Sequence, residues 1–125
     1  MNMCHALAEK AAEEGESPVG SVIVKDGVVI GEAWEKSRQL KDISRHAEML
    51  AILDAVRRGA DLSGATMYSN VEPCILCAYA IRHYRIGEVV YERPAGELGG
   101  TNPRFNVLTA EGVGPWGPPP VVTVI

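Results

Sequence analysis

Hydrophobic and polar positions follow two different periods along the chain, and the period changes several times. A spacing of three to four residues predicts amphipathic helices, whereas β-branched runs bounded by glycine, aspartate or proline predict strands. Asp26-Gly27 separates two such runs, which is a strong signal for a hairpin. The pattern predicts helices over 2–14, 45–58 and 74–84, and strands over 19–25, 28–34, 66–71, 88–91 and 121–125.

The order of these elements predicts an α/β fold in which helices lie on both faces of a sheet. Ser44 is the predicted N-cap of the second helix. Residues 92–120 hold most of the glycine and proline, and only 104–109 has the composition for a short helix there. The chain of 125 residues shows no internal repeat and no linker, so residues 1–125 are expected to form a single domain.

Composition and charge narrow the class of protein. Hydrophobic residues make up 46% and charged residues 22%, as is usual for globular proteins. No apolar stretch approaches the roughly 20 residues of a membrane span, and no secretory signal is recognisable, so a cytoplasmic location and no membrane partner are expected. The net charge of −4 argues against nucleic acid as a partner, since polyanions select basic surfaces.

The candidate chemistry lies in His46-Ala47-Glu48 and Pro73-Cys74-Ile75-Leu76-Cys77. Cys74 and Cys77 are one helical turn apart, and two thiolates with one imidazole suit zinc. Three protein ligands leave the fourth position open, the arrangement of catalytic zinc, which lowers the pKa of bound water to about 7. Glu48 lies two residues from His46 and is the predicted catalytic residue, a carboxylate that moves protons between water and substrate.

Two other interpretations of the cysteines are less favoured. A closed structural zinc site needs a fourth ligand, and the only spare candidates are Cys4 and His5, far upstream in a predicted helix. A redox-active Cys-x-x-Cys pair would leave the His46-x-Glu48 pattern as a coincidence. Cys4 itself is expected to be a buried thiol without chemistry.

His-x-Glu followed by Pro-Cys-x-x-Cys is the signature of zinc deaminases. The chain resembles the cytidine and deoxycytidylate deaminase superfamily, in the branch of guanine deaminase, cytosine deaminase and tRNA adenosine deaminase. The resemblance extends to Pro18-Val19-Gly20, Val29-Ile30-Gly31 and Arg85-Ile86-Gly87-Glu88, and to the 28-residue separation (74 − 46) of the two motifs. It implies a three-layer α/β/α sandwich around a five-stranded mixed sheet (cytidine deaminase-like), a Zn²⁺ cofactor and assembly into a homodimer or larger oligomer.

The resemblance also implies where the substrate binds. The backbone of Ala47 and the carbonyl of Glu72 would contact the base, and Asn70 belongs to the same expected substrate-binding set. Members of the family usually close the pocket with a C-terminal helix. This chain ends instead on a predicted strand, so Phe105 and Trp116 are the candidates for covering the pocket.

Glu35 is a departure from the family, which usually has an asparagine after the second strand. An ionised glutamate only accepts hydrogen bonds, so an inward Glu35 would favour a ring that presents N–H or amino groups. The alternative is an outward Glu35 that pairs with Lys36, Arg38 or Lys41.

These observations predict a hydrolytic deaminase of a free nucleobase or a similar small aminated heterocycle, such as guanine, cytosine, isocytosine or an aminotriazine. One alternative is an editing deaminase of tRNA or single-stranded nucleic acid, which needs a phosphate-binding surface. Another is a non-catalytic scaffold with the deaminase fold. The negative net charge and the absent C-terminal helix place the editing enzyme second.

Overall fold

The structure is a computed structural model that describes all residues, 1–125. Two single-turn 3-10 helices lie in the glycine- and proline-rich part of the chain. The elements are α1 (Asn2–Glu13), β1 (Gly20–Lys25), β2 (Val28–Trp34), α2 (Ala47–Arg57), β3 (Thr66–Val71), α3 (Ile75–His83), β4 (Glu88–Arg93), η1 (Gly96–Leu98), η2 (Gly114–Trp116) and β5 (Val121–Val124).

The five strands form one mixed sheet in the order β2-β1-β3-β4-β5. β1 pairs antiparallel with β2 and with β3, whereas β4 pairs parallel with β3 and with β5. The predicted hairpin is confirmed: Asp26 and Gly27 both have positive φ, 52° and 76°, as the tight two-residue turn between twisted strands requires. Because β1 and β3 are antiparallel, the segment before β1 and the segment after β3 lie at the same end of these two central strands.

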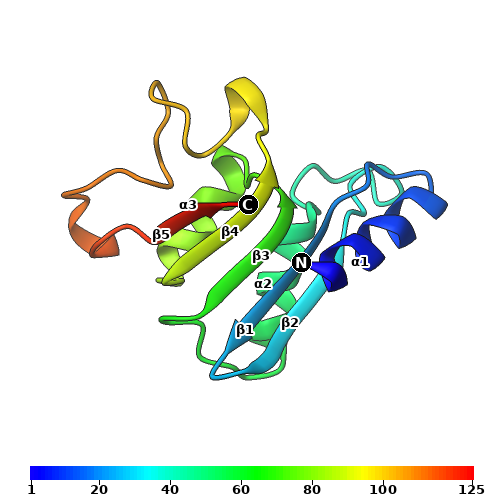
Figure 1. The fold of residues 1–125 in the computed structure, drawn as a ribbon, viewed down its shortest axis with the longest axis horizontal. Coiled ribbons are helices and arrows are strands. Elements are labelled where there is room, and N and C mark those ends of the chain that lie inside the picture. The colour runs from blue at the N-terminus through cyan, green and yellow to red at the C-terminus, as the bar shows by residue number, and fades with distance from the viewer.

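Helices cover both faces of the sheet, which confirms the expected α/β/α sandwich (Figure 1). α1 lies on one face over β1, β2 and β3, and α2 and α3 lie on the other. The main core is between the sheet and the helix pair, where Ile23, Met67 and Val89 pack with Ile52 and Ile81, all fully buried. Full burial of a side chain of this size contributes roughly 1.5–3 kcal/mol to stability.

Two glycines let the helices approach the sheet closely. A Cβ on Gly31 of β2 would lie 2.4 Å from the carbonyl oxygen of Ala51 in α2. A Cβ on Gly20 of β1 would lie equally close, 2.4 Å, to the carbonyl oxygen of Cys4 in α1. No side chain fits at either distance, so glycine is required at both positions by packing.

The predicted start of the second helix is wrong by two residues. Ser44 does not cap it, because the amide N–H and the hydroxyl of Ser44 both donate to Asp42 Oδ1, at 2.9 and 2.6 Å. The helix begins at Ala47, and its N-cap is His46, whose backbone is extended.

The short helix predicted over 104–109 is absent, and that segment forms turns. Instead, carbonyl groups between residues 107 and 117 accept hydrogen bonds from an arginine of α3 and from one just after it. The guanidinium of Arg82, 1% exposed, donates to the carbonyl oxygens of Val107 (2.8 Å) and Gly117 (3.3 Å). Arg85 donates to the carbonyl oxygen of Pro115 at 3.0 Å. The irregular segment is therefore held by two arginine side chains rather than by a helical ladder.

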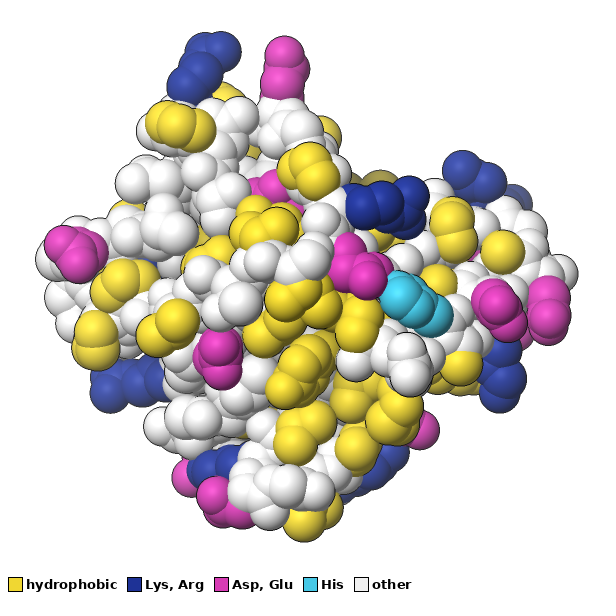
Figure 2. All heavy atoms as spheres, viewed as in Figure 1, with side chains coloured by type: hydrophobic (Ala, Val, Ile, Leu, Met, Phe, Trp, Pro, Cys, Tyr) yellow, Lys and Arg dark blue, Asp and Glu magenta, His cyan; other side chains and the backbone are white.

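On the face that α1 covers only in part, apolar side chains gather over the middle of the sheet (Figure 2). The Nε2 atom of His5 in α1 lies 2.6 Å from Oε1 of Glu92 in β4. The partner of this histidine is therefore a carboxylate. None of the helices combines the length and the apolar character that crossing a membrane demands.

Candidate active site

The three expected metal-ligating side chains meet at the starts of two helices. His46 is the N-cap of α2, Cys74 is the N-cap of α3, and Cys77 lies one turn into α3. Both helices present their N-terminal N–H groups here, and the positive end of a helix dipole favours a thiolate. The sequence folds this way locally because Pro73 precedes Cys74 and ends the extended segment that follows β3.

The distances between the donor atoms fit a zinc ion. Cys74 Sγ lies 3.4 Å from His46 Nδ1 and 3.7 Å from Cys77 Sγ, and Cys77 Sγ lies 3.6 Å from His46 Nδ1. A tetrahedron with Zn–S bonds of about 2.3 Å and a Zn–N bond of about 2.0 Å requires S···S near 3.8 Å and S···N near 3.5 Å. One nitrogen and two sulfur donors at these separations match zinc in both geometry and softness.

The pKa values of these three side chains are shifted strongly from their usual values. Hydrogen bonding from Cys77 lowers the pKa of Cys74 to about 4, so Cys74 is a thiolate. The Cys74 sulfur in turn raises the pKa of His46 to about 9, and hydrogen bonding to Cys74 together with burial raises the pKa of Cys77. The site thus holds a preformed negative sulfur beside an imidazolium and a thiol whose protons a metal would displace.

Glu48 lies in the first turn of α2, two residues beyond His46, and is only 4% exposed. Burial raises the pKa of its carboxyl to about 8, and the negative charges of Cys74 and Glu35 add to the rise. A nearby dication would pull that pKa back toward neutrality. A carboxyl group that gains and loses a proton near pH 7 is suited to general acid–base catalysis.

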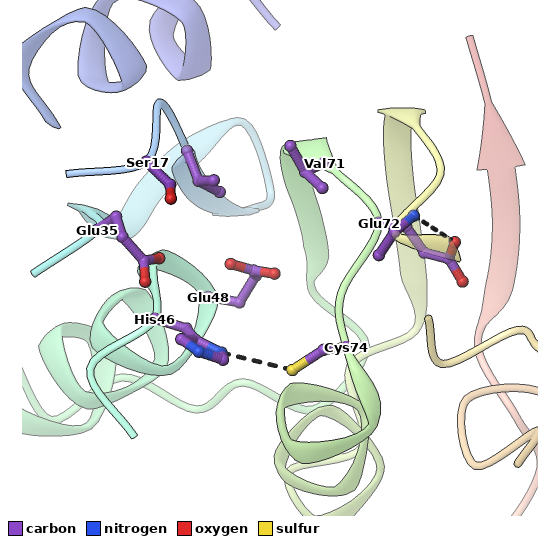
Figure 3. Close-up of a pocket in the computed structure, with 9 residues that line it drawn as sticks. Ser17, Glu35, His46, Glu48, Val71, Glu72 and Cys74 are labelled. Carbon is purple, nitrogen blue, oxygen red and sulfur yellow. Dashed lines mark hydrogen bonds between the residues drawn. The ribbon is translucent and has the colours of Figure 1, made fainter. Parts of the chain in front are cut away.

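These groups open into a pocket of about 190 Å³ at the edge of the sheet. Figure 3 shows Glu35, His46 and Glu48 on one side of this pocket and Val71 and Cys74 on the other. The lining comes from the segment before β1, the end of β2, the start of α2, and the segments after β3 and β4. The lining residues are Ser17, Val19, Glu35, His46, Glu48, Val71, Glu72, Cys74 and Ala95.

Glu35 lines this pocket and is 7% exposed, which settles the direction of its side chain. Its Oε1 accepts the N–H of Ala47 at 3.0 Å, and its Oε2 accepts the hydroxyl of Ser37 at 2.7 Å. The alternative of an outward Glu35 paired with a basic side chain is wrong, because no ion pair of the structure includes it. Glu35 therefore both faces the pocket and holds the first N–H of α2.

The remaining expected substrate-binding residues are distributed differently. Glu72 lines the pocket, but Ala47 is fully buried behind it. Asn70 does not line the pocket: its amide accepts from Gly20 N and donates to the carbonyl oxygen of Pro18, both at 2.9 Å. It thereby fixes the segment that carries Ser17 and Val19, which are pocket residues.

Phe105 and Trp116 do not cover the pocket either. Phe105 is 45% exposed beneath the guanidinium of Arg104. Trp116 packs edge-on against Tyr79, with ring centroids 5.3 Å apart. The part of the glycine- and proline-rich segment that does reach the pocket is Ala95.

Four pocket residues were not anticipated from the sequence: Ser17, Val19, Val71 and Ala95. The only available signal was Pro18-Val19-Gly20, which the family resemblance singled out as the lead into the hairpin. Ala95 carries no such signal, because its place depends on contacts with residues more than twenty positions away.

A three-layer sandwich with an open His–Cys–Cys site and a buried glutamate beside it defines a zinc-dependent hydrolytic deaminase. The sequence profile described as "Cytidine and deoxycytidylate deaminase zinc-binding region" matches residues 1–93. The chain belongs to this family, and Zn²⁺ is its cofactor.

Several curated relatives share a substrate class. The tRNA-specific adenosine deaminase of Aquifex aeolicus is 44% identical over 103 residues, which cover 81% of this chain and 68% of that protein. The tRNA-specific adenosine deaminase of Streptococcus pyogenes is 36% identical over 106 residues, covering 83% and 67%. The chain thus spans about two thirds of the length of these relatives.

Solved structures of this fold include deaminases of more than one substrate class. One from a study of A-to-I editing by tRNA:A34 deaminases at the wobble position of transfer RNA superposes with a TM-score of 0.88. It is 30% identical and covers 100% of this chain and 95% of that chain. Guanine deaminase from Bacillus subtilis superposes with a TM-score of 0.70 at 34% identity, covering 74% and 61%.

These comparisons overturn two expectations from the sequence. A free nucleobase or other small molecule as the substrate is wrong, because the curated relatives with 36–44% identity are tRNA-specific adenosine deaminases. The argument against nucleic acid is wrong for the same reason. It rested on the net charge of −4, which sums over the whole surface and does not describe the surroundings of the pocket.

Proposed function

We propose that this protein is an editing deaminase that converts adenosine to inosine at wobble position 34 of tRNA. The observation that carries the proposal is the 44% identity to a tRNA-specific adenosine deaminase over 103 residues, a region that includes both zinc motifs. The structural likeness to a tRNA:A34 deaminase over the whole chain supports it. Location in the cytoplasm and assembly into a homo-oligomer stay predictions.

The reaction adds water to C6 of the adenine ring and breaks the C6–N6 bond, giving inosine and ammonia. In our proposal His46, Cys74 and Cys77 hold the zinc ion, which supplies Lewis-acid activation of water when bound. Glu48 takes a proton from the attacking water and passes it to N1 of the ring. A second proton transfer through the same carboxyl group reaches the departing amine, so one buried residue serves as base and then as acid.

The pocket walls suit one flipped-out base. The space of about 190 Å³ between Val71, Ala95 and the zinc-side residues is our candidate for a single unstacked base, since enzymes that act on a base take it out of the stack. Glu35, with both oxygens already accepting hydrogen bonds, retains lone pairs toward the cavity. We propose that Glu35 accepts a hydrogen bond from a donor group of the bound nucleoside.

A basic loop borders the pocket. Residues 36–45, which we call the basic loop, contain Lys36, Arg38, Lys41 and Arg45 against a single acid, Asp42. Pocket residues flank the loop on both sides, Glu35 before it and His46 after it.

The cations of the basic loop are available to an external anion. Arg45 pairs with Asp42 at 3.2 Å, but Lys36, Arg38 and Lys41 form no ion pair. The ammonium of Lys36 lies 4.1 Å from the centroid of the Trp34 ring, and Arg38 donates to the carbonyl oxygen of Gly15, so neither charge is neutralised by a carboxylate. Cations placed around a pocket attract the phosphates of a strand whose base enters it. The basic loop is therefore our candidate for the RNA contact.

The proposed function is tested with the zinc-loaded protein and an RNA stem-loop that carries adenosine at the wobble position. We expect inosine at that position and ammonia in equal amount. Free adenosine, adenine and guanine serve as small-molecule controls and are expected to turn over at least about a thousandfold more slowly, because binding energy from the remote strand is lost. Deamination of guanine with no product from RNA would refute the proposal.

The basic loop makes a separate prediction for RNA binding. Changing Lys36, Arg38 and Lys41 together to alanine should weaken binding of the stem-loop by about ten- to a hundredfold at low salt. It should also flatten the dependence of log K on log salt by about two, since each lost phosphate contact removes roughly 0.7. Binding is measured by fluorescence anisotropy at several salt concentrations.

The matched control changes Lys25, Arg57 and Arg58 to alanine. This control also removes three positive charges, but from positions that do not line the pocket. Equal losses in the two triple variants would show that net charge alone governs binding, which would contradict a role for the basic loop.

A further inference from the structure

The side chain of Glu72 is buried beside the zinc motif but does not point at the zinc site. Figure 3 shows its carboxylate turned away from Glu48. The residue is 4% exposed, and both of its oxygens accept hydrogen bonds from one stretch of chain. Oε1 accepts the N–H of Ala95 at 3.0 Å, whereas Oε2 accepts the N–H and the hydroxyl of Thr101, at 2.9 and 2.6 Å.

Those three donors belong to residues 94–101, which we call the wall segment because Ala95 lines the pocket. The backbone of the wall segment also contacts the zinc motif directly. Gly100 N donates to the carbonyl oxygen of Pro73 at 2.8 Å, and Gly99 forms an isolated antiparallel bridge with Cys74.

The contact is close enough to require glycine. A Cβ on Gly99 would lie 2.3 Å from Glu72 Oε2, and a Cβ on Gly100 would lie 2.9 Å from the Cβ of Ala78. The wall segment therefore lies against the carboxylate itself, and its position depends on where that carboxylate is.

We propose that Glu72 is a positioning residue for substrate: its carboxylate fixes the wall segment, and thereby Ala95, against the pocket. A buried carboxylate with three donors from one segment is a strong local constraint, since hydrogen bonds to a charged group are worth about twice those between neutral groups. The role differs from contact between the Glu72 backbone and the base, because it acts through a side chain that points elsewhere.

The hydrogen bonds around Glu72 can be made by a carboxylate but not by the amide of glutamine. In Glu72→Gln one oxygen becomes an NH₂ group, which faces the N–H of Ala95 or the donors of Thr101. Two donors then face each other in a buried place, so part of the wall segment must leave its position. The hydrogen bonds of the zinc-ligating atoms join them to one another and not to this carboxylate, so we expect zinc to be retained.

The experiment compares two identical substitutions. Thr101→Val removes one hydroxyl that donates to Glu72, and Thr123→Val removes one hydroxyl that donates to Glu88 Oε2 at 3.1 Å, on β5 away from the pocket. We measure KM and kcat on the RNA stem-loop, zinc content, and amide hydrogen exchange of residues 94–101. Glu72→Gln is the stronger variant and is measured in parallel.

We expect KM to rise about tenfold in Thr101→Val and about a hundredfold in Glu72→Gln, with kcat changed less than about threefold and zinc retained. Exchange of the wall segment should accelerate in both variants but not in Thr123→Val. Unchanged KM and exchange in Thr101→Val, or equal effects in both threonine variants, would overturn the proposal. Zinc loss in Thr101→Val would overturn it as well.

The kinetic arm rests on the proposed function, but the exchange arm does not. If the wild-type protein does not act on RNA, the function fails, and exchange of the wall segment alone then decides whether Glu72 holds it. If Glu72→Gln does not fold, Thr101→Val still gives a result.

Discussion

Replacing Glu48 with glutamine is expected to lower turnover by about 10⁴-fold while leaving fold and zinc content unchanged. Glutamine keeps the size of the side chain but cannot take a proton from water or return it. Burial raises the pKa of Glu48 to about 8, which suits proton transfer near neutral pH, and the amide of glutamine does not titrate in that range.

The effect is measured as the rate of inosine formation at saturating RNA, together with metal analysis of both proteins. Glu111→Gln, an exposed carboxylate outside the pocket lining, is the matched control and should keep full activity. A Glu48→Gln protein with a tenth of the wild-type rate would remove Glu48 from its assigned role.

Replacing Cys77 with alanine should reduce zinc from about one ion per chain to nearly none, and activity with it. Cys77 is fully buried and supplies one of only three donor atoms. A remaining imidazole and thiolate cannot hold zinc against a chelator in the way three ligands do. Cys4→Ala is the control, because Cys4 is an equally buried thiol whose sulfur donates to the carbonyl oxygen of Tyr68. Equal zinc in the two variants would place the metal elsewhere.

Zinc uptake should also weaken as pH falls. In the metal-free site His46, with a pKa of about 9, and Cys77, with a raised pKa, both carry protons at pH 7, whereas Cys74, with a pKa of about 4, does not. Zinc binding at pH 7 therefore releases about two protons, and the affinity should fall by about a hundredfold per pH unit below that. Calorimetry in buffers of different ionisation enthalpy measures this number. Release of fewer than one proton would contradict the assignment.

Elements whose signals are local were predictable from the sequence. The Asp26-Gly27 turn, the helix that carries Glu48, and the His46 and Cys74 motifs each depend on residues a few positions apart. The start of that helix was misplaced because Asp42 takes both donors of Ser44, a competition that composition does not reveal.

The walls of the pocket were not predictable, since they depend on contacts between distant residues. Glu72 and Thr101 are 29 positions apart, and no periodicity links them. Phe105 and Trp116 were expected to cover the pocket in place of the C-terminal helix usual in the family, but cation–π and edge-on contacts engage them elsewhere. The argument from net charge against nucleic acid failed for a related reason. The net charge counts the acids of α1 equally with the cations that border the pocket.

The close approach at Gly31 has a consequence for how variation in this chain is read. Even a methyl group there would push against the carbonyl oxygen of Ala51 and displace α2 from the sheet. His46 and Glu48 sit at the near end of that helix, so the shift would reach both together. In a screen for activity, Gly31→Ala would therefore resemble the loss of a catalytic residue, although Gly31 lies in the middle of β2 and does not line the pocket.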